Sequence, residues 1–254
     1  MAIKIAMANK KGGIGKSTTA LAVASGLIRR GYRVLMIDTD PQRNTTRVYR
    51  DKTEGQATLY DIIFANYKAK DCIQHTEYGD IIASDENLEN ADTQISPGPK
   101  MYKYIKNAVS EVEEEYDFII YDTPPRAGIL LGNVLMSCQY VITPCTCDAF
   151  GVQGIMDFYE IIEEYREDNE ALSILGLLII KYKGRQKLTQ DIEDNLLPGY
   201  AKDMNTIIFN TRVRESVKCQ EAQTMRTSIF DYDAHCTTAL DYDCLIDEIL
   251  KEVM

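Results

Sequence analysis

The chain has 254 residues, of which 45% are hydrophobic, and its formal net charge is −11. This length suits one large α/β domain, and no apolar run approaches the roughly 18 residues that a membrane span needs. The acidic excess excludes a surface that attracts nucleic acid or anionic lipid everywhere, so any such face must be local. Seven scattered cysteines and an N-terminus without the ordered regions of a secretory signal indicate a reducing, cytoplasmic setting.

Short apolar runs alternate with longer segments of helical periodicity along the chain. Strands are expected at residues 3–8, 33–38, 80–84, 117–123, 139–144, 174–181 and 205–210. Helices are expected at 17–30 and near 59–64, 100–115, 151–167, 187–197, 214–225 and 236–253, with the rest of 41–79 as loop. The pattern predicts a three-layer, doubly wound, mostly parallel sheet of about seven strands with helices on both faces. A single domain over residues 1–254 is the simplest organisation.

A glycine-rich segment, MANKKGGIGKSTT at residues 7–19, lies between the first expected strand and the first long helix. Its glycines let backbone N–H groups turn inward, and the start of the helix favours an anion. Lys16 can reach the β- and γ-phosphates of a nucleotide, and the Ser17 hydroxyl can bind Mg²⁺. The general signature G-x-x-x-x-G-K-[ST] has its first glycine where this chain has Lys10. The segment therefore predicts a phosphate loop of a variant kind.

The run KGGIGKST at residues 11–18 resembles the deviant phosphate loop of the ParA/MinD class of ATPases, written K-G-G-x-G-K-[ST]. The resemblance implies a P-loop NTPase fold that binds ATP or ADP with Mg²⁺. It also implies a homodimer formed around ATP, in which Lys11 reaches the partner's phosphates as an arginine finger does. Lys10 has no role in that class. The nucleotide contacts implied here are Gly12, Gly13, Ile14, Gly15, Lys16, Ser17 and Thr18.

Two further segments end apolar strands with aspartates. VLMIDTDPQRN at 34–44 resembles the class motif D-x-D-P-Q-G-N, in which Asp40 positions the attacking water and the Mg²⁺ shell, although Arg43 replaces the usual glycine. YDFIIYDTPP at 116–125 has the Walker B pattern, so Asp122 should hold Mg²⁺, usually through water. The implied metal-site residues are Ser17, Asp40 and Asp122, and the implied catalytic residues are Lys11, Lys16 and Asp40.

The second half contains a basic segment, KYKGRQK at residues 181–187. It resembles the ParA segment T-M-Y/F-D-x-R-T-x-L-S, in which Arg185 and Leu188 match and Lys183 replaces an aspartate. A solvated face and a contact with DNA phosphates both remain open for these cations. Residues 210–242 resemble the C-terminal region of the family, which puts Asn210, Arg212 and Val213 in a loop near adenine. The candidate DNA contacts are Lys181, Lys183, Arg185, Arg214 and Lys218.

The whole chain resembles the small ParA type, which lacks an N-terminal helix-turn-helix. The resemblance implies a partition ATPase of the nucleoid: the ATP-bound dimer binds DNA nonspecifically, and a ParB-type, centromere-binding partner stimulates hydrolysis and release, without a membrane. A MinD-like membrane-cycling regulator is the main alternative, but the end CLIDEILKEVM is acid-rich rather than basic and amphipathic. A metal-cluster relative would need paired cysteines, and only C-x-C at 145–147 is present. A metabolic synthetase of the same fold usually lacks the signature lysine.

Overall fold

The computed structural model describes residues 1–49, 55–183 and 186–254. In that part of the chain eight strands form one sheet, in the order β3-β4-β2-β5-β1-β6-β7-β8. Every neighbouring pair is parallel except β3 with β4. The strands are β1 (Ile3–Met7), β2 (Val34–Asp38), β3 (Ile73–Thr76), β4 (Gly79–Ile82), β5 (Phe118–Asp122), β6 (Tyr140–Cys145), β7 (Ser173–Tyr182) and β8 (Ile207–Arg214).

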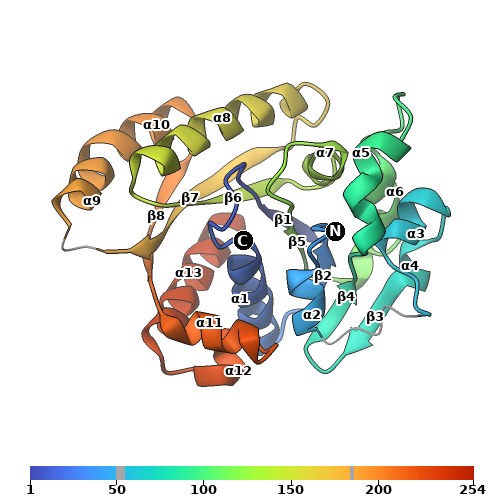
Figure 1. Ribbon diagram of the computed structural model, residues 1–254, viewed down its shortest axis with the longest axis horizontal. Coiled ribbons are helices and arrows are strands. Elements are labelled where there is room, and N and C mark those ends of the chain that lie inside the picture. Colours follow the sequence, from blue (N-terminus) through green and yellow to red (C-terminus); the bar gives the residue numbers. More distant parts are fainter. Residues whose placement is uncertain (50–54, 184–185) are drawn as a thin grey trace.

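Helices cover both faces of this sheet (Figure 1). The α-helices are α1 (Lys16–Arg29), α2 (Asn44–Val48), α3 (Leu59–Phe64), α4 (Ala69–Cys72), α5 (Ala91–Gln94), α6 (Tyr104–Val109), α7 (Ile129–Leu135), α8 (Ala149–Arg166), α9 (Lys187–Asp191), α10 (Leu197–Asp203), α11 (Val217–Thr224), α12 (Ile229–Asp233) and α13 (Thr237–Val253). Three short segments complete the elements: η1 (Glu86–Asn90), η2 (Glu113–Glu115) and the π-helical η3 (Ile192–Leu196). The predicted fold class, a three-layer and mostly parallel α/β sheet, is confirmed.

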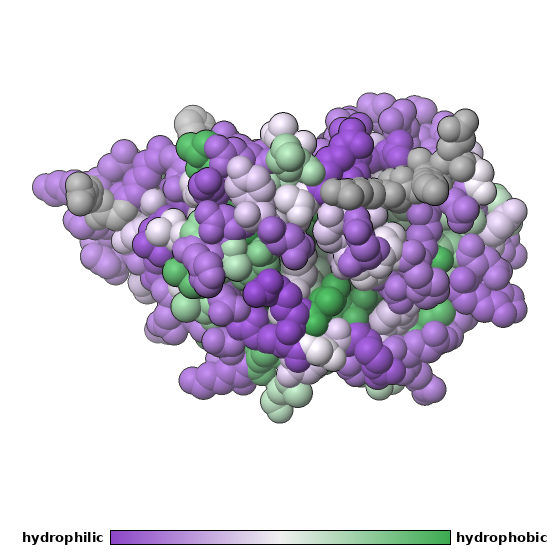
Figure 2. Space-filling view, turned by 90° about the horizontal axis from the view of Figure 1, so that it is seen from below, coloured by the Kyte–Doolittle hydropathy of each residue, from purple (hydrophilic) through white to green (hydrophobic). Residues whose placement is uncertain are grey.

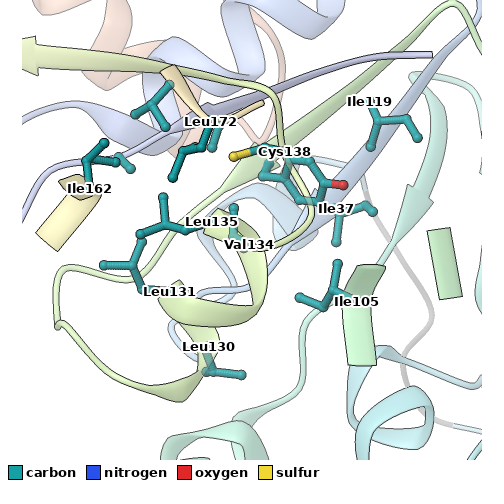
Figure 3. Close-up of a cluster of buried hydrophobic side chains, with 14 of the residues drawn as sticks. Ile37, Ile105, Ile119, Leu130, Leu131, Val134, Leu135, Cys138, Ile162 and Leu172 are labelled. Atoms are coloured by element: carbon teal, nitrogen blue, oxygen red, sulfur yellow. The ribbon is translucent and has the colours of Figure 1, made fainter. Parts of the chain in front are cut away.

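Two apolar layers hold the helices to the sheet. One lies under α1, α12 and α13, and the other under α3, α6, α7, α8 and α10. Because β2 and β5 are buried at every position, they contribute to both layers, as their consecutive apolar residues predict. Each buried aliphatic side chain stabilises the fold by roughly 1.5–3 kcal/mol. Figure 3 shows part of the second layer, with labelled side chains Ile37, Ile105, Ile119, Leu130, Leu131, Val134, Leu135, Cys138, Ile162 and Leu172.

The segment expected to be loop with one short helix contains an additional strand. The helix at Leu59–Phe64 forms as expected, but Ile73–Thr76 forms β3, which pairs antiparallel with β4 at the edge of the sheet. None of its residues is fully buried, so an edge strand of this kind leaves no apolar run in the sequence. Within the described residues the sheet therefore has eight strands, one more than the seven segments expected.

The strand order brings together the loops that follow β1, β2 and β5. β5 lies between the other two, and Met7 and Asp38 are the register partners of Asp122 on either side. In a parallel sheet the carboxyl ends of neighbouring strands meet at one edge, which is where α/β proteins bind ligands. The glycine loop and the two aspartate segments consequently face a common space.

Candidate nucleotide-binding site

The glycine loop has the backbone geometry that an anion site needs. Gly13 and Gly15 have φ angles of +66° and +86°, which side chains disfavour, and a Cβ atom at Gly13 would meet nothing within 4 Å. Gly15 caps the N-terminus of α1 without a side-chain hydrogen bond, and the first turn carries no acidic residue. The N–H groups and positive end of this 14-residue helix are thus left for a ligand.

A cavity of about 590 Å³ opens beside this loop. Its walls include the loop and the start of α1, Asp40, α2, the ends of β7 and β8, α11 and the start of α13. Six of the seven predicted contacts, Gly13 to Thr18, line it, whereas Gly12 does not. The volume lies within the range of ordinary small-ligand sites.

Lys16 is the buried cation of the cavity. Its side chain starts in the first turn of α1, the residue is only 6% exposed, and Nζ donates a hydrogen bond to the Lys11 carbonyl oxygen at 3.2 Å. Burial lowers its pKa, while the attraction of Asp122 and Asp40 opposes that shift. A buried ammonium group beside the backbone N–H groups at the N-terminus of α1 can bind the phosphates of a nucleotide through charge-assisted hydrogen bonds.

Asp122 offers an unsatisfied carboxylate oxygen. The residue is fully buried, its Oδ2 accepts a hydrogen bond from Thr45 Oγ1 at 2.6 Å, and its Oδ1 has no hydrogen-bond partner among the described residues. Burial raises its pKa to about 6, while the Thr45 and Ser17 hydroxyls oppose the shift. A spare carboxylate oxygen near a serine hydroxyl fits Mg²⁺, which takes one or two protein ligands and completes its shell with phosphates and water.

Asp40 and Asp38 have different roles. Asp40 lines the cavity at 7% exposure, and burial raises its pKa, with Lys16 among the groups that oppose the shift. Asp38 lies deeper and accepts hydrogen bonds from Asp40 N (3.0 Å), Thr46 N (2.8 Å) and Thr46 Oγ1 (2.7 Å). Asp38 therefore fixes the loop that carries Asp40. Arg43, which replaces a glycine, has a φ of +58°, so the loop keeps the left-handed conformation that glycine adopts readily.

Thr45→Val is expected to lower the free energy of unfolding by about 1–3 kcal/mol, because it leaves a second buried Asp122 oxygen without a donor. The measurement is urea unfolding in EDTA. The control is Thr93→Val, since Thr93 is exposed and bonds only to the nearby Asn90 carbonyl oxygen. An effect of T45V within about 0.5 kcal/mol of zero would contradict the assigned contact.

Comparisons with known proteins agree with this geometry. The AAA domain family AAA_31 matches residues 2–174. The chromosome-partitioning ATPase Soj of Treponema pallidum is 30% identical over 248 residues, which cover 95% of this chain and 94% of that protein. The chain belongs to the ParA/Soj family of P-loop ATPases. The chromosome partitioning protein ParA of Caulobacter vibrioides is 26% identical, over 97% of this chain and 93% of that protein.

The fold is shared with solved structures of other activities. Cobyrinic acid a,c-diamide synthase from Mycobacterium smegmatis, with a bound ATP analogue and magnesium, matches with a TM-score of 0.82 and 22% identity. The match covers 99% of this chain and 95% of that one. At this identity the likeness concerns the fold, so the activity of this ParA/Soj family member must be argued from its own residues.

The signature lysine of this ParA/Soj family member points away from its own cavity. Lys11 Nζ lies 3.3 Å from Asp148 Oδ1 and 3.4 Å from Thr146 Oγ1, both on the connection from β6 to α8. Lys11 is absent from the cavity wall. Asp148 also accepts a hydrogen bond from Gly151 N and so caps α8. Lys10 is exposed, and its role stays unassigned.

The loop expected near adenine is wrong in its bounds. Asn210, Arg212 and Val213 lie inside β8, which runs to Arg214, and only Val213 lines the cavity. Glu248 of α13 accepts hydrogen bonds from the N–H groups of Asn210 and Thr211, where the pairing with β7 shifts register, so the strand continues past its apolar run. Arg212 instead bonds to Glu193. The cavity is also lined by residues that the sequence did not indicate. Several lie on α11 and α13, namely Cys219, Gln220, Gln223, Thr224, Thr238 and Tyr242, and others lie on α2, namely Asn44, Arg47 and Val48.

Each candidate DNA contact in the described part of the chain either pairs with an acidic side chain or lines the cavity. Lys183 pairs with Glu215 at 2.8 Å, and Lys218 pairs with Glu221 at 3.4 Å. Arg214 donates to both carboxylate oxygens of Asp241. Lys181 lines the cavity. Arg185 and the side chain of Leu188 lie outside the described part of the chain.

Proposed function

We propose that this protein is an ATP-dependent partition ATPase, whose ATP-bound homodimer binds DNA nonspecifically and is released when a ParB-type partner stimulates hydrolysis. The observation that carries the proposal is the convergence of Lys16, Asp40 and Asp122 on one glycine loop at the edge of the sheet. The partition role is inferred from the chromosome-partitioning relatives, and the chemistry of the site supports ATP binding and hydrolysis. Residues 1–254 would act as a single domain in the cytoplasm, on the nucleoid.

The chain's own groups would divide the work of hydrolysis. The phosphate loop and Lys16 hold and neutralise the phosphates, and Asp38 fixes the loop of Asp40, which orients the attacking water. Ser17 and Asp122 would hold Mg²⁺, which neutralises charge on the phosphates when bound. The raised pKa of Asp40 brings its basicity nearer to that of a water-activating group.

Dimerisation would give Lys11 its function. In the single chain the Lys11 side chain is part-buried against Thr146 and Asp148, away from the cavity of its own subunit. In the proposed dimer it leaves these partners and reaches the nucleotide of the second subunit, where a cation stabilises the transferring phosphoryl group. This exchange would couple ATP occupancy to assembly.

The membrane-cycling alternative receives no support from the C-terminal helix. Most apolar side chains of α13 are buried, with Leu240 as the exposed exception, and the helix packs against β8 and α1. Among the helices described, none is long and apolar enough to cross a bilayer. The face that contains α11 and α12, seen in Figure 2, is mostly hydrophilic, with apolar residues in small separate groups.

Co-sedimentation with DNA, with and without ATP and at two salt concentrations, tests the proposal. We expect binding only with ATP, weakened roughly tenfold or more between 50 and 200 mM salt, because contacts to phosphates release counterions. Anionic vesicles replace DNA in a parallel assay. Binding of DNA that is indifferent to ATP and salt, or ATP-dependent binding to vesicles instead, would contradict the partition function.

A further inference from the structure

A bulge near the end of β7 sets Lys181 apart from the other basic residues of its segment. Ile180 and Tyr182 pair with the consecutive residues Val213 and Arg214 of β8, so Lys181 is the extra residue between them. Its φ of +51° is in the left-handed region, which a lysine rarely adopts. Bulges of this kind change the direction of a side chain and are frequent next to active sites.

The bulge directs Lys181 to the phosphate loop. Its Nζ donates a hydrogen bond to the Gly13 carbonyl oxygen at 2.8 Å, across 168 positions of the sequence, and the residue lines the 590 Å³ cavity. The preceding Ile180 also touches this loop, because its Cδ1 lies 3.0 Å from the place of a Cβ atom on Gly15. The end of β7 therefore contacts the phosphate loop at two glycines.

The neighbouring Lys183 provides the contrast. It is two residues away and exposed, pairs with Glu215, and is absent from the cavity wall. Two lysines of one basic segment thus have different surroundings. Both lysines are exposed, but the ammonium group of Lys181 is bonded to the phosphate loop, whereas that of Lys183 pairs with Glu215.

We propose that Lys181 is a positioning residue of the nucleotide site, which holds the phosphate loop closed on a nucleoside di- or triphosphate. The inference rests on the proposed ATP-binding function. Because the loop cradles the α- and β-phosphates that ADP and ATP share, both nucleotides depend on the contact to the same degree. The positive charge also adds to the field that attracts the phosphates.

The test is calorimetric titration of the full chain with Mg²⁺–ADP and with a non-hydrolysable Mg²⁺–ATP analogue. Lys181→Ala should weaken both about fivefold to tenfold, the range for loss of a charge-assisted hydrogen bond. Lys181→Arg should restore at least half of the lost affinity on a logarithmic scale. Lys183→Ala is the matched control and should bind like wild type. Lys181→Gly removes the ammonium while easing the left-handed backbone, so it should fold and bind as weakly as K181A.

The same titrations distinguish a failure of the role of Lys181 from a failure of the proposed ATP-binding function. Wild-type protein that binds neither nucleotide would overturn both. If the wild type binds nucleotide and the affinity of K181A or K181G is within twofold of the wild-type affinity, only the role of Lys181 is overturned. If such a variant also loses DNA co-sedimentation, Lys181 is a DNA contact instead. K181R as weak as K181A would also contradict a contact made by the positive charge.

Discussion

Lys16→Ala is expected to abolish nucleotide binding, with an affinity at least roughly 100-fold below that of wild type. Lys16 is a buried cation in the wall of the phosphate cavity, and it is close enough to Asp40 and Asp122 to attract both carboxylates. Without it, the two carboxylates would repel the phosphates with no opposite charge to offset them. Titration calorimetry with Mg²⁺–ADP and a non-hydrolysable ATP analogue measures the loss.

The matched control for this variant is Lys10→Ala. Lys10 lies in the same loop but is exposed and absent from the cavity wall, so its loss should change affinity by less than about twofold. Lys16→Gln, which keeps most of the side-chain volume without the charge, should behave like K16A and so controls for the space that alanine leaves. Retained affinity in K16A and K16Q would refute the role of Lys16.

Asp40→Ala is expected to slow ATP hydrolysis about 100- to 1000-fold while nucleotide binding persists. The carboxylate lies on the cavity wall and is oriented by the Gln42 N–H group at 3.0 Å, so its removal leaves the attacking water without its acceptor. The ATP-bound dimer should then accumulate. Phosphate release at saturating ATP gives the rate, and light scattering after size exclusion gives the mass of the ATP-bound species.

Glu86→Ala is the control carboxylate for Asp40. Glu86 lies 3.4 Å from Arg43 of the same loop but outside the cavity, so its loss should leave the turnover rate nearly unchanged. Normal hydrolysis by D40A would contradict the assignment of Asp40. Loss of nucleotide affinity in D40A would show instead that Asp40 supports the loop rather than the water.

The convergence of the phosphate loop with the two aspartate segments could be predicted from the sequence, because each is a local pattern at the end of an apolar strand. Parallel strands bring such ends to one edge, and β1, β5 and β2 are adjacent in the sheet. The edge strand β3 could not be predicted, since no residue of it is buried. The extension of β8 past Asn210 could not be predicted either, because the hydrogen-bond acceptor for the N–H groups of Asn210 and Thr211 is Glu248 of the distant helix α13.

The sequence by itself determined the fold class and the chemical groups of the phosphate site, since both follow from short-range periodicity and from residue types at fixed spacing. Only the tertiary structure decided how the remaining cations are used. Lys11 meets Asp148 across 137 positions, and Lys181 meets Gly13 across 168. A basic segment read alone leaves both a solvated face and a contact with DNA open. The acceptor that selects between these uses comes from a distant element, and it is brought near only when the sheet has assembled.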